Sequence, residues 1–230
     1  LGMLAIGAGG IDVAVAMGGG AFYLTGPSII KIELTGRRWP WSSAKDVVLK
    51  VLEMFSTKGN VNCVLEYAGS GVKNLDVTER ATITNMGTES GVTTSVFPSD
   101  EVTKTFLEAQ GRGEVWREIA ADKDAQYDRV EKITLSEIEP MAAAPHSPGN
   151  IVTVTSLAGM KVNQILIGSC TNSSYRDLKT VAKLLEGKKV HPEVSLGIAP
   201  GSRQVLEMLA SEGLLAELIK SGARILENAC

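Results

Sequence analysis

The sequence predicts an α/β fold built mainly on parallel sheets. Between residues 162 and 230, short apolar segments alternate with amphipathic segments of helical length, and parallel strands need such crossover helices between them. Residues 29–36 alternate apolar and polar side chains, which is typical of a strand with one face in water. The chain has 230 residues, of which 44% are apolar and 21% charged, and this composition can support a buried core.

The first half of the chain begins with strands and helices in alternation. After the strand at 29–36, the apolar residues of segment 44–59 recur at helical spacing, and Gly59 is placed to end this helix. The elements expected next, in order, are a buried strand at 62–67, a Gly-rich turn at 68–71, a helix over 78–90 that stops near Gly91, a β-branched strand at 92–97, a helix capped by 98–100 that runs to 109, a polar helix or loop at 111–125, and a strand at 132–140.

The second half has a more regular order. The elements expected there are strands at 162–170, 194–200 and 223–230 and helices at 173–187, 202–213 and 214–222. Residues 140–150 precede them and contain three prolines and one glycine, which is the composition of a linker. We therefore expect a domain boundary within this segment.

Residues 1–24 are mostly apolar, yet we expect no membrane span there. Eight glycines fall within the first 26 residues, Asp12 interrupts the apolar run, and no positive charge flanks it. The chain begins without Met and stops at a cysteine directly after an expected strand. We expect both ends to continue into a longer polypeptide.

The charge and the cysteine content narrow the classes of function. Lys and Arg total 23 and Asp and Glu total 26, which gives a formal net charge of −3, and aromatic residues make up 5%. A mildly acidic chain with few aromatic residues is poorly suited to bind nucleic acid. Its 3 cysteines are widely spaced, so they do not form a disulfide framework and indicate a reducing compartment, which we expect to be the cytoplasm.

Two of the cysteines follow expected parallel strands. Cys170 ends the strand at 162–170 and Cys230 ends the strand at 223–230. The carboxyl ends of parallel strands share one edge, so we expect both cysteines on the same rim. The helix after Cys170 begins with capping residues, and its positive end would favour a thiolate. Spacing alone leaves two alternatives open, ligation of a metal or cluster and burial as small apolar residues, and Cys63, within an apolar strand, favours the second.

Two further features could carry chemistry. Glu89 lies in an uncharged segment of small residues, one helical turn after Asn85, and could act as an acid or base or lie on a helix surface. Residues 199–202 open a helix after a strand and could bind an anion through backbone N–H groups.

Four segments, in the same order, resemble segments of the aconitase family. LIGSCTNSSYRDL (166–178) resembles the family's cluster-ligand signature, and ENAC (227–230) resembles the start of its second signature. NMGTESGVTTSVFP (85–98) is similar to the segment that carries an active-site Asn and Glu, and LGMLAIGAGGIDVAVAMGGG (1–20) to the segment after an Asp-Ser-His motif. TTSVFP and NAC resemble the aconitate hydratase branch more than the 3-isopropylmalate dehydratase or homoaconitase branches.

The resemblance implies a hydro-lyase with an aconitase-like α/β/α fold. The parent enzyme would interconvert citrate and isocitrate through cis-aconitate, with a [4Fe–4S] cluster held by three cysteines and one iron left open. By residue match, Cys170 and Cys230 are two of the ligands, and Asn172 belongs to the cofactor-binding segment. Glu89 would hydrogen-bond the hydroxyl or water at the cluster, and Asn85 would orient groups there.

Several parts of the family pattern are absent from this chain. The third cysteine, the Asp-Ser-His segment, the substrate-binding arginines and the swivelling domain are missing, so we expect the chain alone to bind no complete cluster and to lack dehydratase activity. By resemblance, its domains are the tail of a first α/β domain (1–28), a second α/β domain (29–144), a linker (145–148) and part of a third domain (149–230).

The expected partners are a tricarboxylate substrate and the remainder of the parent polypeptide, without a membrane and without nucleic acid. A large subunit of 3-isopropylmalate dehydratase or homoaconitase is one alternative for the parent. A non-catalytic fragment that binds zinc or RNA is another.

Overall fold

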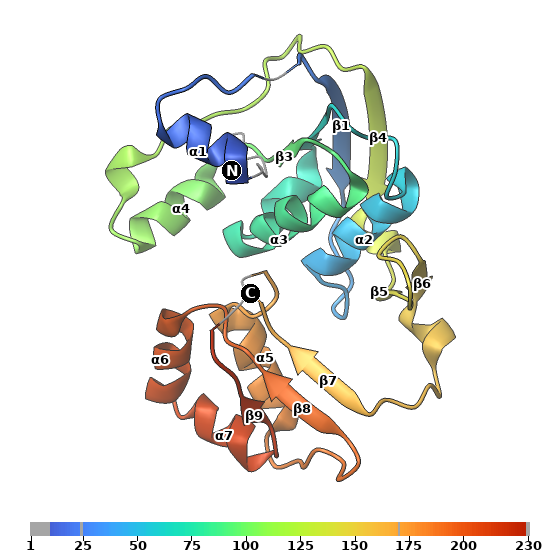
Figure 1. Cartoon of the computed structure of the whole chain (residues 1–230), viewed down its shortest axis with the longest axis vertical. Helices are drawn as coiled ribbons and strands as arrows, with labels where there is room; N and C mark the ends of the chain where they lie inside the picture. The colour runs from blue at the N-terminus through green and yellow to red at the C-terminus, as the bar shows by residue number, and fades with distance from the viewer. Residues whose placement is uncertain (1–9, 24, 170, 229–230) are drawn as a thin grey trace. The chain divides into compact units, whose positions relative to one another are not determined.

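The computed structural model describes residues 10–23, 25–169 and 171–228. It divides into two compact units, unit 1 (Leu1–Ala158) and unit 2 (Gly159–Cys230), each with its own sheet (Figure 1). The main sheet of each unit is parallel, which confirms the predicted fold class. Among the described residues, no helix has the length and apolar character needed to cross a membrane.

The described residues of unit 1 form a four-stranded parallel sheet in the order β3-β2-β1-β4. Its strands are β1 (Ser28–Thr35), β2 (Cys63–Ala68), β3 (Thr94–Val96) and β4 (Arg129–Thr134). Along β1, Ile30, Ile32 and Leu34 are buried and the residues between them are partly exposed. This alternation confirms the strand with one wet face.

Unit 1 also contains helices and short 3-10 turns. The helices are α1 (Gly10–Met17), α2 (Ala44–Phe55), α3 (Val77–Gly87) and α4 (Glu101–Ala109), with shorter 3-10 turns η1 (Ser70–Asn74), η2 (Thr88–Ser90), η3 (Gly113–Val115), η4 (Leu135–Glu137) and η5 (Val154–Leu157). The predicted cap of α4 is confirmed, because the Asp100 side chain accepts hydrogen bonds from the Val102 and Thr103 amides.

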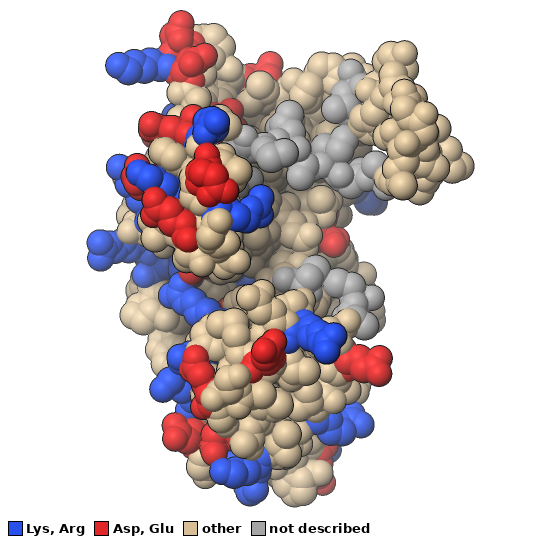
Figure 2. Space-filling view, turned by 90° about the vertical axis from the view of Figure 1, so that its left-hand side faces the viewer, with Lys and Arg blue, Asp and Glu red and all other residues tan. Residues whose placement is uncertain are grey.

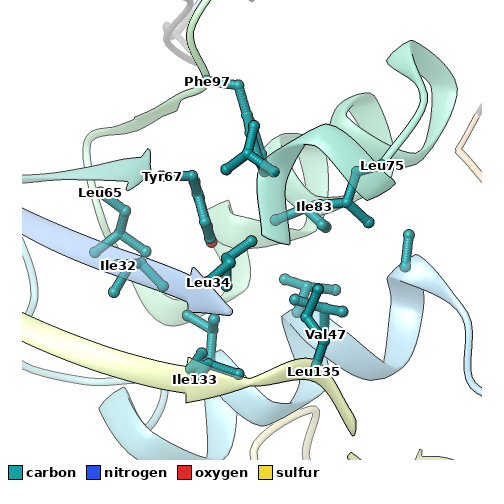
Figure 3. Packing of buried hydrophobic residues seen from close by; sticks show 14 of the residues in the cluster. Ile32, Leu34, Val47, Leu65, Tyr67, Leu75, Ile83, Phe97, Ile133 and Leu135 are labelled. Carbon is teal, nitrogen blue, oxygen red and sulfur yellow. The ribbon is translucent and has the colours of Figure 1, made fainter. Parts of the chain in front are cut away.

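The core of unit 1 lies between the sheet and the helices α2 and α3. In Figure 3, Ile32, Leu34 and Leu65 of the sheet and Val47 and Ile83 of the helices belong to one cluster of buried side chains. Tyr67 and Phe97 stack at the side of this core, with ring centroids 4.4 Å apart. Each fully buried aliphatic side chain of this kind stabilises the folded state by roughly 1.5–3 kcal/mol, so this packing fixes the position of α3.

Unit 2 repeats the strand and helix order that the sequence predicts. Its described residues form a parallel sheet in the order β7-β8-β9, made of β7 (Gln164–Ile167), β8 (Ser195–Ile198) and β9 (Arg224–Ile225). The helices α5 (Tyr175–Leu185), α6 (Arg203–Ser211) and α7 (Leu214–Lys220) contact one another. The buried residues that join them to β8 are Leu178, Ala182, Leu196, Ile198, Leu209 and Leu218.

The Pro-rich segment 140–150 is folded within unit 1. The strands β5 (Met141–Ala143) and β6 (Ile151–Thr153) pair as an antiparallel hairpin, and this hairpin contacts α2. The connection between the two compact units follows Ala158. The four-part domain division that the family resemblance implies stays a prediction.

Candidate functional site

The carboxyl ends of the three strands of unit 2 are tied together by backbone hydrogen bonds. The Ala199 amide donates to the Ile167 carbonyl, and the Leu226 amide donates to the Ile198 carbonyl, each at 2.8 Å. The exits of β7 and β9 therefore lie on one edge with β8 between them, about 10 Å apart at the usual strand spacing. Cys170 and Cys230 themselves lie outside the described residues, so the meeting of their thiols at this edge stays a prediction.

The segment that leaves β7, residues 168–173 without Cys170, is here called the β7 exit loop. Its bend is made by Ser169, which has a φ of 78°, a left-handed backbone conformation that residues other than glycine rarely adopt. The Thr171 amide donates to the Ser169 Oγ at 3.3 Å, and the Ser173 Oγ donates to the Ser169 carbonyl. Ser173 is fully buried, so the loop has a defined shape on both sides of position 170.

The turn at residues 199–202 is hydrogen-bonded to the β7 exit loop. The Gly201 amide donates to the Ser173 carbonyl at 3.0 Å, and the Val205 amide donates to the Ser202 Oγ at 3.2 Å as the cap of α6. With the Ala199 amide also paired, these three donors already have acceptors in the protein. The turn thus connects two loops, and these donors do not support the anion-binding alternative.

Asn85 and Glu89 lie in unit 1, where α3 ends and η2 follows, and both side chains are exposed. The Thr88 Oγ1 donates to the Asn85 carbonyl at 2.8 Å, and the Ser90 Oγ donates to the Gly87 carbonyl at 2.6 Å. An exposed carboxylate on a tightly bonded turn can reach a ligand without moving the backbone. The acid–base role of Glu89 stays a prediction.

Asn60 is a residue that the sequence analysis missed. Its Nδ2 donates to the Ser90 carbonyl at 2.7 Å and to the Phe55 carbonyl at 2.9 Å, and so it joins the end of α2 to the turn that carries Glu89. α2 ends at Phe55, four positions before Gly59, because Ser56 leaves the helical conformation with a φ of 56°. An Asn directly after a glycine is a common turn signal, but nothing local reveals an acceptor 30 residues away.

A cavity of about 480 Å³ lies at the carboxyl ends of β2 and β3 in unit 1. Its wall is mostly apolar, and the charged residues Glu66, Lys73 and Asp100 are among those that line it. Glu66 accepts a hydrogen bond from the Tyr127 hydroxyl at 2.6 Å, and Asp100 pairs with Arg80. Neither Asn85 nor Glu89 lines this cavity. The cavity is therefore separate from these two candidate residues.

The described residues offer few metal donors. Over 10–23, 25–169 and 171–228, no three or more His, Cys, Asp or Glu side chains gather in a way that could hold a metal ion. The described sequence neighbours of Cys170 include the hydroxyl residues Ser169, Thr171 and Ser173, and the binding of a metal cluster at this edge stays a prediction. Cys170 and Cys230 lie outside the described residues, and their role as ligands stays a prediction.

Charge on the molecular surface is mixed. On the face that Figure 2 presents, Lys and Arg side chains lie among Asp and Glu side chains, without a continuous basic area among the described residues drawn there. Nonspecific binding of nucleic acid depends on such an area. This face therefore gives no support to an RNA-binding function.

Comparison with known families gives one match that spans the chain. The family model described as "Aconitase family (aconitate hydratase)" matches residues 1–230. The match thus includes both units and all the candidate residues.

Curated relatives match over the same length. The chain is 37% identical over 230 residues to the "3-isopropylmalate dehydratase large subunit 2" of Rubrobacter xylanophilus, covering 100% of this chain and 54% of the relative. It is 38% identical over 251 residues to "Homocitrate dehydratase, mitochondrial" of Saccharomyces cerevisiae, covering 100% of this chain and 32% of the relative. The chain therefore spans about half the length, or less, of these relatives.

One solved structure aligns with most of this chain. The crystal structure of Thermococcus kodakaraensis aconitase X (holo-form) aligns with a TM-score of 0.47 at 15% sequence identity, covering 89% of this chain and 44% of that chain.

Proposed function

This chain belongs to the aconitase family, and we propose that it is the part of a hydro-lyase that supplies two cluster ligands and an acid–base carboxylate. The family match over residues 1–230 supports this proposal, as do relatives described as dehydratases. The single observation that carries it is the edge shared by the exits of β7 and β9. Two cysteines 60 positions apart follow strands that end on that edge.

Cys170 and Cys230 are proposed as two of the three thiolate ligands of a [4Fe–4S] cluster. When bound, the cluster supplies a Lewis-acidic iron that stabilises charge on a departing oxygen. Along the chain, Cys170 comes three positions after the end of β7 and Cys230 five positions after the end of β9. The third thiolate would come from the remainder of the parent polypeptide, so the isolated chain should neither bind a complete cluster nor dehydrate a substrate.

Glu89 is proposed to form a hydrogen bond with the substrate's departing hydroxyl or to transfer a proton to it. Loss of hydroxide from carbon is slow at neutral pH unless the leaving oxygen is protonated or bonded to an electrophile. The Glu89 carboxyl is exposed at the end of α3, and its turn is fixed through Ser90 and Asn60. Asn85, on the preceding helical turn, would orient polar groups of the substrate.

The proposed substrate is a hydroxy-tricarboxylate such as citrate or isocitrate. The names of the relatives support 3-isopropylmalate and homocitrate as much. The relative from Rubrobacter xylanophilus is described as a large subunit, which supports a partner subunit in addition to the rest of the parent chain. Cytoplasmic location is proposed from the sparse cysteines.

The test is a dehydration assay on the whole protein, with its remaining segments and any partner subunit. Citrate, 3-isopropylmalate and homocitrate are offered separately, and the conjugated alkene is followed by its ultraviolet absorbance. One of them should be dehydrated, and Glu89→Gln should lower kcat by about 10²–10⁴-fold. Glu101→Gln, an exposed carboxylate of α4, is the matched control. Turnover of none of the three, or an unchanged rate in Glu89→Gln, would contradict the proposal.

A further inference from the structure

The cavity at the carboxyl ends of β2 and β3 has no part in the proposed function. Its volume of about 480 Å³ is typical of small-molecule sites in proteins, and the carboxyl edge of an open parallel sheet is where α/β proteins bind ligands. The apolar residues of its wall include Val72 of η1, Val96, Phe97 and Pro98 at the end of β3, and Ile119 with the two alanines that follow it. A ligand that fills this space therefore needs an apolar body.

Buried hydrogen bonds fix part of the wall. Arg80 is fully buried, and its guanidinium donates to the Val72 carbonyl at 3.1 Å and to the Pro98 carbonyl at 3.2 Å. The same group donates to both carboxylate oxygens of Asp100 at 2.8 Å. Val72, Pro98 and Asp100 all line the cavity, so one buried side chain holds three of its residues in place.

Two further parts of the wall are fixed through the backbone. Gly69, which follows β2, has a φ of 94°, and a Cβ there would lie 2.4 Å from the Leu34 carbonyl oxygen, so only glycine lets the chain leave β2 this close to β1. The amides of Ser99 and Ile119 donate to each other's carbonyls at 2.8 and 3.0 Å. The cavity is therefore preformed, which lowers the cost of ordering the protein when a ligand binds.

Of the three charged residues that line the cavity, two can still bind a ligand. Both oxygens of Asp100 already accept from Arg80. The Glu66 Oε1 accepts from the Tyr127 hydroxyl at 2.6 Å, and burial together with this carboxylate raises the pKa of Tyr127 to about 12, so the hydroxyl remains a donor at neutral pH. Within the described ranges, the Glu66 Oε2 and the Lys73 ammonium have no hydrogen-bond or ion-pair partner.

We propose that this cavity binds an apolar amino acid as its zwitterion. The ligand's ammonium group donates to Glu66, its carboxylate accepts from Lys73, and its side chain packs against the apolar wall beside Phe97. An amine or a carboxylate alone leaves one of the two charged groups without a partner, and charge-assisted hydrogen bonds are the stronger ones. The cavity therefore selects ligands that carry both charges, and this site does not depend on the proposed cluster.

The test is an NMR titration of the isotope-labelled 230-residue chain with four probes. L-phenylalanine carries all three features, hydrocinnamate lacks the ammonium group, phenethylamine lacks the carboxylate, and glycine lacks the apolar body. L-phenylalanine should shift the amide signals of Gly69, Phe97 and Ala120, which line the cavity. Loss of either charged group should weaken binding by about tenfold or more, and glycine should leave these signals unchanged because it buries no side chain.

Two variants assign the charges. Glu66→Gln should weaken the binding of L-phenylalanine by about tenfold or more without weakening that of hydrocinnamate. Lys73→Met, which keeps an apolar stem, should weaken the binding of both carboxylates to a similar extent and leave that of phenethylamine unchanged. Lys132→Met is the matched control, because Lys132 is an exposed lysine of β4 that does not line the cavity, and it should bind L-phenylalanine as the parent does.

Several outcomes would overturn the proposal. One is the absence of shifts at the three amides with L-phenylalanine near its solubility limit. Another is equal affinity for L-phenylalanine, hydrocinnamate and phenethylamine, which would show that the cavity takes up apolar molecules without reading their charge. Shifts confined to amides outside the cavity would place the binding elsewhere. The four probes on the parent chain decide between these results even where a variant fails to fold.

Discussion

Arg80 is the fully buried cation of the described part of unit 1, and its side chain joins three segments. Its Nη1 and Nη2 each donate to an oxygen of Asp100 at 2.8 Å. The other donors reach the carbonyls of Leu75, Val72 and Pro98 at 3.1–3.2 Å. Since Arg80 belongs to α3, which also carries Asn85, this network fixes the helix at whose end the proposed acid–base group lies.

Removal of the Asp100 charge should therefore destabilise unit 1 strongly. Asp100→Asn leaves a good N-cap residue for α4 but leaves Arg80 as a buried charge without a counter-ion, which costs about 3 kcal/mol or more. Urea unfolding measures the difference. Glu101→Gln, at an exposed pair with Lys104, should change the free energy of unfolding by less than about 0.5 kcal/mol, and a similarly small effect of Asp100→Asn would contradict the role of the network.

The same pair predicts how stability depends on pH. Burial alone would raise the pKa of Asp100, but the hydrogen bonds and charge of Arg80, helped by the Thr103 and Val102 amides, hold that pKa below its ordinary value. An acid with a lowered pKa contributes stability above the unfolded value of about 3.9, and this contribution is lost as the pH falls through the folded pKa. Urea midpoints should fall over this acid range in the parent and fall less in Asp100→Asn. Parallel profiles of the two proteins would show that Asp100 is not the titrating group.

At the scale of elements, alternation and capping signals predicted most of the fold. The wet and buried faces of β1, the cap of α4 and the alternation of strands and helices along unit 2 follow from local patterns. The hairpin β5–β6 does not, because it depends on Asp46, 95 residues away, whose Oδ1 accepts from the Met141 amide at 2.6 Å. The proline content of segment 140–150 suggested a linker. It could not reveal that the Asp46 carboxylate accepts a hydrogen bond from this segment.

Asp46 should stabilise both the start of α2 and the hairpin. Its Oδ2 also accepts from the Ser43 amide at 2.6 Å, so Asp46→Ala removes a helix cap together with a hydrogen bond to a charged acceptor, with a combined cost of about 2–4 kcal/mol. Hydrogen exchange should accelerate at the Met141 amide. Glu53→Gln, at the exposed end of α2, is the control. An unchanged rate of hydrogen exchange at the Met141 amide in Asp46→Ala would contradict this explanation.

At the scale of the whole molecule, the chain consists of two units with an exposed connection. Residues from Ala158 to Asn163 are exposed, and the prolines of segment 140–150 lie in a hairpin whose ends are hydrogen-bonded. Limited subtilisin digestion should therefore cut first between 158 and 163, as read from the intact masses of the fragments. A first cut within 145–148 would instead support the linker expected from composition.

The candidate site was predictable in part. Strand alternation is enough to place the exits of β7 and β9 on one edge, and the family segments single out Cys170, Cys230, Asn85 and Glu89. The contact that joins the β7 exit loop to the turn after β8 was not predictable, since the Gly201 amide and the Ser173 carbonyl are 28 positions apart. A left-handed serine and a close backbone approach leave no pattern in a single sequence.

The most direct measurement is the iron–sulfur content of the whole protein in three single variants. After reconstitution with iron and sulfide, visible absorption and electron paramagnetic resonance report the cluster. Cys170→Ser and Cys230→Ser should each lose it, whereas Cys63→Ser, which replaces a half-buried cysteine packed against the core of unit 1, should retain it. A full cluster in Cys170→Ser and Cys230→Ser would contradict the account.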